Sequence, residues 1–133
     1  MATTNPYQSY KQNSVNTASP GELTLMLYNG CLKFIGLAKN AIKNNDIATR
    51  NVNIQKAQNI IQELMVTLNM EIPISKNFMS LYDFMNRQLI KANIVSDIKI
   101  LEDVEFLLVE FRDTWKEAIQ INRQKQYASG GKV

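Results

Sequence analysis

Residues 19–42 read SPGELTLMLYNGCLKFIGLAKNAI, and this segment sets the architecture of the chain. Ser19 suits an N-cap, Pro20 the first helical position and Glu22 a capping box, so a helix is predicted to begin here. At about 100° per residue, its apolar residues form two clusters and leave only a narrow polar wedge. The first cluster includes Leu27, Phe34 and Leu37, and the second includes Leu25, Leu32 and Ile35. A helix that covers one side of a small core needs a single apolar stripe. We therefore expect this helix to lie in the middle of a helical assembly or beneath a partner.

The composition favours one ordered, mostly helical domain. The chain has 133 residues, of which 45% are apolar, with only five Gly and three Pro, so it has enough apolar residues to form a hydrophobic core. No run reaches about 18 apolar residues, so we expect no membrane insertion. The N-terminal residues lack the basic and apolar regions of a signal peptide, and the single Cys31 cannot form an internal disulfide. A cytoplasmic location is the simplest expectation.

Four helices are predicted, at about residues 20–43, 47–69, 76–92 and 97–123. Ser75 is expected to cap the third helix and Asp97 the fourth. Short loops force neighbouring helices to run antiparallel, so the fold class is all-α, an antiparallel four-helix bundle. The predicted organisation is a short mobile or partly helical N-terminal arm at 1–18, the bundle at 19–123 and a flexible C-terminal tail at 124–133.

The later helices each show an inward stripe of apolar residues at helical spacing. The second has Ile54, Ala57, Ile61, Leu64, Met65 and Leu68. The third has Phe78, Leu81, Tyr82, Met85, Leu89 and Ala92. The fourth has Ile100, Leu101, Val104, Leu107, Leu108, Phe111, Trp115, Ala118 and Ile119.

Residues that carry chemistry are scarce. The chain has no histidine and one cysteine, which argues against a zinc site, a di-iron bundle and a His general base. No glycine-rich phosphate loop occurs, and Cys31 is best read as a small core residue. The basic residues are scattered and the net charge is only +3, so no nucleic-acid partner is expected. We expect no enzyme activity and no cofactor.

The fourth predicted helix carries seven of the twelve acidic residues, so its outer face is either simply solvated or a docking surface. Phe106 and Val109 lie off its core stripe, among Glu102, Glu105 and Asp113. Apolar groups set among charges often mark docking, although single exposed apolar residues are also common. Both interpretations stay open.

Several short motifs occur in an ordered series along the chain. They are Leu27-Tyr28-Asn29-Gly30, Lys56-Ala57 with Ile60-Ile61 and Leu64, Leu81-Tyr82-Asp83-Phe84-Met85, Leu89, Ala92-Asn93, Asp97, and Trp115-Lys116-Glu117-Ala118. With the opening Ser19-Pro20-Gly21-Glu22-Leu23, this series resembles the flagellar secretion chaperone FliS family, the export chaperones of flagellin. The resemblance covers about residues 7 to 120. Asn29 and Asn69 stand where the family usually has Asp.

The resemblance implies a cytosolic antiparallel bundle that holds the disordered C-terminal segment of flagellin. Holding that segment prevents premature polymerisation and keeps flagellin competent for flagellar type III secretion, without catalysis. The flagellar export gate and regulatory proteins are further partners to consider. Independently of the resemblance, the chain has surplus apolar surface, which a chaperone for an amphipathic tail needs.

The candidate partner-binding residues are apolar groups expected to lie off the core. On the first helix they are Leu25, Leu32 and Ile35, and on the fourth Phe106 and Val109. Tyr7 and Tyr10 join them, because aromatic residues in a polar arm bury much area when they dock over a groove. The alternative is that the arm is disordered and that its two tyrosines have no role. Tyr28, Tyr82 and Trp115 are expected in the core.

Two other functions remain open from the sequence. A helical regulatory adaptor would bind an anti-sigma factor or another flagellar regulator through the same groove. A self-associating bundle would use its surplus apolar surface as a homodimer interface.

Overall fold

The computed structural model describes the backbone of residues 20–130 and the side chains of residues 21–124. This part of the chain folds into four helices, α2 (Pro20–Lys43), α3 (Ile47–Thr67), α4 (Ser75–Val95) and α5 (Ile98–Gly130). The predicted all-α, antiparallel four-helix fold is confirmed. Ser19 and the N-terminal arm lie outside the described residues.

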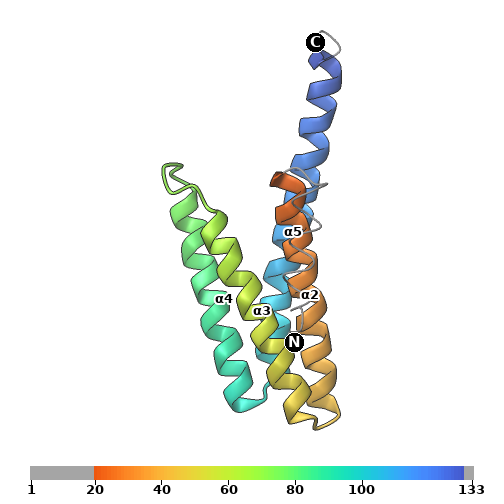
Figure 1. The fold of residues 1–133 in the computed structure, drawn as a ribbon, viewed down its shortest axis with the longest axis vertical. Coiled ribbons are helices and arrows are strands. Elements are labelled where there is room, and N and C mark those ends of the chain that lie inside the picture. Colours follow the sequence, from red (N-terminus) through yellow and green to blue (C-terminus); the bar gives the residue numbers. More distant parts are fainter. Residues whose placement is uncertain (1–19, 131–133) are drawn as a thin grey trace, which may run out of the picture.

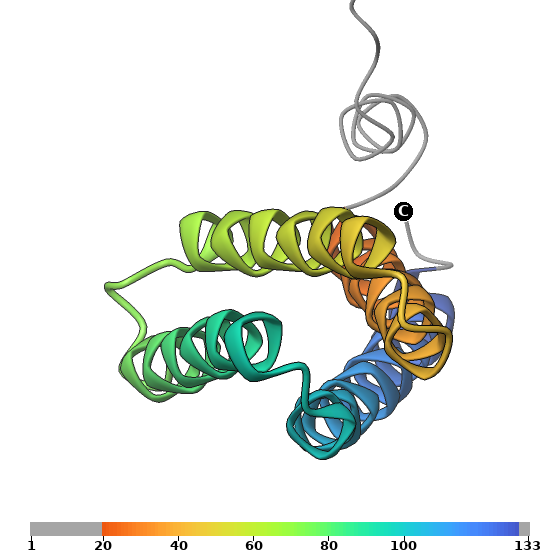
Figure 2. The ribbon, with the colours of Figure 1, turned by 90° about the horizontal axis from the view of Figure 1, so that it is seen from below.

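The helices form a ring in which α2 packs against α3 and α5, and α4 packs against the same two helices. Seen along the bundle, α3 and α4 lie on one side and α2 and α5 on the other (Figure 2). Figure 1 shows that the pairs α3/α4 and α2/α5 diverge toward the loop that joins α3 to α4. This divergence opens the bundle at one end.

Carboxylate caps precede two of the four helices. The Asp46 carboxylate accepts the Thr49 backbone N–H at 3.1 Å at the start of α3. The predicted cap Asp97 is confirmed, since its carboxylate accepts the Lys99 N–H at 2.9 Å. The prediction for Ser75 was wrong, because Ser75 is the first residue of α4 and is buried.

Three helix ends differ from the prediction, and one of them is the end of α4, which continues past residue 92 to Val95. Helix α3 ends at Thr67, because Leu68 already has an extended backbone. Helix α5 continues past residue 123 to Gly130, so residues 124–130 of the predicted tail have a helical backbone.

One continuous core joins all four helices. Its fully buried large side chains are Tyr28, Leu27, Ile35, Ile54, Ile60, Ile61, Leu64, Met85, Leu89, Leu101, Leu108 and Val104. Most predicted inward residues lie in this core or pack against it. The exceptions are Leu81 and Ala118, which are exposed, and Ile119, which is half-buried outside this core.

Helix α2 is buried along one wide face rather than along two separate ones. Cys31, between the two predicted clusters, is fully buried and marks the centre of this face. Leu27 comes from the first cluster and Ile35 from the second, and both are fully buried. Because α2 contacts both α3 and α5, it needs this wide apolar face for the bundle itself.

Candidate functional site

An apolar cleft of about 260 Å³ lies at the open end of the bundle. All four helices and the α3–α4 loop contribute to it. Its lining comprises Thr24, Tyr28, Thr67, Leu68, Asn69, Ile72, Ile74, Ser75, Phe78, Tyr82 and Trp115. None of these side chains carries a charge at neutral pH, so the cleft suits an apolar ligand.

Two buried tyrosines meet in this cleft. The Tyr28 and Tyr82 hydroxyl oxygens are 2.5 Å apart, so one hydroxyl donates to the other across α2 and α4. Burial raises the pKa of the Tyr28 phenol, and the hydrogen bond to Tyr82 opposes this only in part. Burial likewise raises the pKa of the Tyr82 phenol. Both therefore stay neutral at physiological pH and act as a satisfied polar pair in an apolar wall.

Aromatic rings make the wall rigid. Phe111 packs edge-on against Phe78 and Tyr82, with ring centroids 5.6 and 6.2 Å away. Trp115 packs edge-on against Tyr28 at 6.5 Å, and its indole N–H donates to the Gly21 carbonyl at 2.8 Å. This last bond joins the N-terminal turn of α2 to α5. Pre-positioned rings lose little side-chain entropy when a ligand arrives.

Two of the residues that line the cleft, Ile72 and Ile74, are exposed apolar residues. In the α3–α4 loop, Met70, Ile72 and Ile74 each expose about half of their surface. On α4, Leu81 and Phe84 are also exposed, although neither lines the cleft. The exposed apolar surface therefore extends from the cleft along the α3–α4 loop, as binding of a helical or extended segment requires.

Five of the seven predicted contact residues lie in the described part of the chain, and none of the five lines this cleft. Leu25 lies in a separate surface hollow between α2 and α5, beside Arg112 and Asp113. Leu32 packs partly against the core, and Val109 is half-buried. Phe106 is 65% exposed on α5.

Ile35 is the clear correction among these predictions. It is 0% exposed, so the expectation that it lies off the core was wrong. Tyr7 and Tyr10 lie outside the described residues.

Sequence reasoning missed the residues that shape the cleft. Tyr28, Tyr82 and Trp115 were assigned to the core alone, yet they also line the cleft. Ile72 and Ile74 belong to a loop, where exposed aliphatic residues on both sides of Pro73 were the available signal.

Metal-binding side chains are not gathered in the described part of the chain. Within it, no group of three or more His, Cys, Asp or Glu residues is close enough to hold a metal ion. Cys31 is buried, its thiol lies 3.6 Å from the Ala57 carbonyl, and burial raises its thiol pKa. It therefore remains a protonated core residue. Among the described residues, no helix is long and apolar enough to cross a membrane.

Known proteins are similar to this chain in sequence and in fold. The flagellar secretion chaperone FliS of Bacillus subtilis (strain 168) is 57% identical over 131 residues, 98% of both chains. The FliS of Escherichia coli (strain K12) is 34% identical over 119 residues, 84% of this chain and 88% of that protein. The crystal structure of a flagellar chaperone from bacteria has the same fold, with a TM-score of 0.72 and 21% identity over 86% of this chain and 94% of the other. The family model for the flagellar protein FliS matches residues 3–122, and this chain belongs to that family.

Proposed function

We propose that this protein is the cytosolic chaperone that binds the disordered C-terminal segment of flagellin. In this role it prevents premature polymerisation and keeps flagellin competent for flagellar type III secretion. It acts by binding alone, without a cofactor or a reaction. The export gate and flagellar regulators are further partners within this proposal.

The uncharged, aromatic-lined cleft is the observation that carries the proposal. A disordered segment that folds on binding must offset its ordering entropy by burying apolar surface. The cleft and the exposed residues of the α3–α4 loop, Met70, Ile72 and Ile74, offer such surface. Membership of a flagellar chaperone family supports a flagellar client.

A calorimetric titration with the C-terminal forty or so residues of flagellin from the same source tests the proposal. We expect a one-to-one complex of micromolar or better affinity with a negative heat-capacity change, because apolar surface is buried. Absence of binding at about 100 µM would contradict the proposal.

A matched pair of variants tests the location of binding. Ile74→Lys places a charge at the cleft, where Ile74 is 53% exposed, and should weaken binding at least about tenfold. Ile94→Lys makes the same change at a 77% exposed site near the opposite end of α4 and should leave affinity unchanged. Equal effects of the two variants would remove the cleft from the proposed mechanism.

A further inference from the structure

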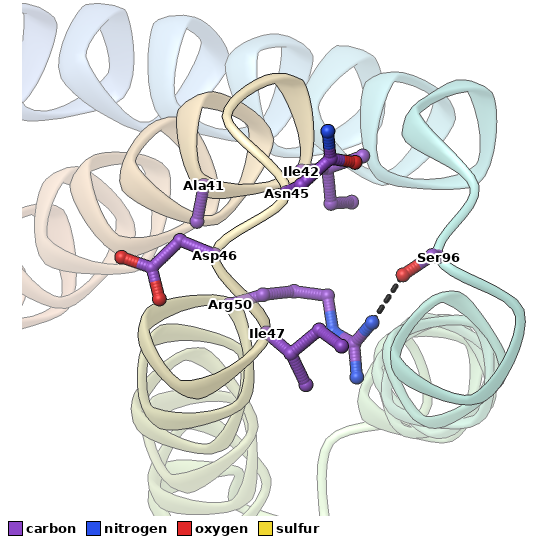
Figure 3. A pocket seen from close by; sticks show the side chains of 7 residues that line it. All are labelled: Ala41, Ile42, Asn45, Asp46, Ile47, Arg50 and Ser96. Atoms are coloured by element: carbon purple, nitrogen blue, oxygen red, sulfur yellow. Dashed lines mark hydrogen bonds between the residues drawn. The ribbon is translucent and has the colours of Figure 1, made fainter.

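A second hollow lies at the opposite end of the bundle, where the α2–α3 turn meets the α4–α5 turn (Figure 3). Its volume is about 230 Å³. Ala41, Ile42 and Ile47 supply apolar surface, while Arg50 and Ser96 supply polar groups. None of these residues has a part in the apolar cleft.

The Arg50 guanidinium is fixed in place by neutral partners. Its Nε donates to the Asn93 Oδ1 at 3.0 Å, and its Nη1 donates to the Ser96 hydroxyl, as drawn in Figure 3. The Asn93 amide donates in turn to the Asn51 side chain on α3. These hydrogen bonds fix the orientation of the planar guanidinium group beside the hollow.

Arg50 is one of two partly buried cations, with Lys56, that have no carboxylate partner among the described residues, and Lys56 instead lies over the Phe34 ring. Lys39 pairs with Glu105 at 2.9 Å, and Arg112 pairs with the neighbouring Asp113 at 3.0 Å. A guanidinium has five N–H donors, and the two hydrogen bonds of Arg50 engage two of them. A partly buried, oriented cation with spare donors is well suited to an incoming carboxylate.

We propose that this hollow binds the C-terminal carboxylate of a partner peptide whose last residue has an aliphatic side chain. Arg50 would hold the carboxylate, and Ala41, Ile42 and Ile47 would contact the side chain. A chain terminus brings both groups on one residue, which matches a hollow of about 230 Å³. An internal Asp or Glu would need room for chain on both sides.

Asp46 limits the affinity of this site. Its carboxylate caps α3 through the Thr49 N–H, and this hydrogen bond lowers its carboxyl pKa, so it is ionised. In Figure 3 it points away from the Arg50 guanidinium, on the other side of the α2–α3 turn. Its charge still opposes an incoming anion. Asp46→Asn keeps a good N-cap while it removes the charge, so it should tighten carboxylate binding.

An NMR titration of the full chain with N-acetyl-leucine tests the site. We expect a Kd of about a few millimolar, as suits so small a ligand, with amide shifts confined to the two turns. N-acetyl-leucinamide lacks the carboxylate and should bind at least about fivefold more weakly, because the charge-assisted pair is lost. Equal binding of acid and amide, or no shifts at about 20 mM acid, would overturn the proposal.

Variants and a simple anion separate the remaining explanations. Arg50→Gln should abolish the preference for acid over amide, whereas Arg87→Gln, on exposed α4 surface, should preserve it. Inorganic phosphate should bind more weakly than N-acetyl-leucine, and equal binding would indicate an unselective anion site instead. If Arg50→Gln fails to fold, Asp46→Asn tests the proposal instead. Removal of the Asp46 charge should tighten the binding of N-acetyl-leucine, and an unchanged affinity would contradict carboxylate binding in this hollow.

Discussion

Removal of one hydroxyl from the Tyr28–Tyr82 pair should destabilise the protein more than removal of both. The two oxygens are 2.5 Å apart, and the side chains are 1% and 3% exposed, so neither hydroxyl has easy access to water. Tyr82→Phe leaves the Tyr28 hydroxyl buried without its partner, and Tyr28→Phe does the reverse. An unsatisfied buried group costs about 1–3 kcal/mol, whereas replacing both partners is close to neutral.

The double variant therefore gives the magnitude of the interaction. If each single change costs about 2 kcal/mol, additivity predicts about 4 kcal/mol for the double variant. With no orphaned hydroxyl left, we expect the double variant to cost less than either single one. The coupling free energy between the two sites should thus exceed about 2 kcal/mol.

Urea unfolding at pH 7 measures these free energies. Far-ultraviolet circular dichroism follows the helices, and Trp115 fluorescence follows the aromatic cluster, because its ring packs against Tyr28. Coincident transitions from the two signals would justify a two-state treatment. Additive single-variant costs would refute the reasoning, because they would mean that each hydroxyl finds a new partner, such as water from the cleft.

Other predictions concern the core, the pH dependence and the arm. Ile35→Ala truncates a core side chain and should lower the free energy of unfolding by about 2–5 kcal/mol. Phe106→Ala, on the exposed surface of α5, should change it by no more than about 0.5 kcal/mol. Urea unfolding of both variants tests whether Ile35 belongs to the core. Burial raises the Cys31 thiol pKa, so the unfolded chain loses this proton first as pH rises. The contribution of the Cys31 thiol to the free energy of unfolding is fully present below the ordinary thiol pKa of about 8.5. Above that pH, the free energy of unfolding falls by up to about 1.4 kcal/mol per pH unit. Cys31→Ala should flatten stability profiles between about pH 8.5 and 10, and an unchanged slope would show that the thiol is not responsible. Deletion of residues 1–15 should alter the calorimetric affinity for the flagellin segment or the solubility of the free protein, and two unchanged values would count against a role for the arm.

The fold was predictable because its signals are local. The predicted cap Asp97 does start α5, and the turn at Asn44–Asp46 does separate α2 from α3. The inward stripes of α3 and α5 were also largely right, because each follows from the helical period alone. Ser75 does not cap α4 because a backbone turn through Ile72 and Ile74 precedes it. The residue preference of N-caps, on which the prediction was based, gives no information about such a turn.

The candidate site was less predictable because it depends on how the helices pack. The wheel of α2 shows a wide apolar sector, but it does not tell which edge faces a neighbour. Ile35 and Leu25 fell in one predicted cluster, yet Ile35 is buried in the core and Leu25 lies in a surface hollow. The cleft arises from the divergence of the two helix pairs, which no single helix encodes.

Each end of the bundle has a feature that is unfavourable for an isolated domain. At one end, the α3–α4 loop exposes Met70, Ile72 and Ile74 where polar loop residues would be more soluble. At the other, Arg50 is partly buried without a carboxylate partner among the described residues. Neither feature helps the free protein, and local conflicts of this kind concentrate where binding is selected. Polar replacements in the loop, or a carboxylate placed beside Arg50, should therefore improve the free chain while they impair binding at that end.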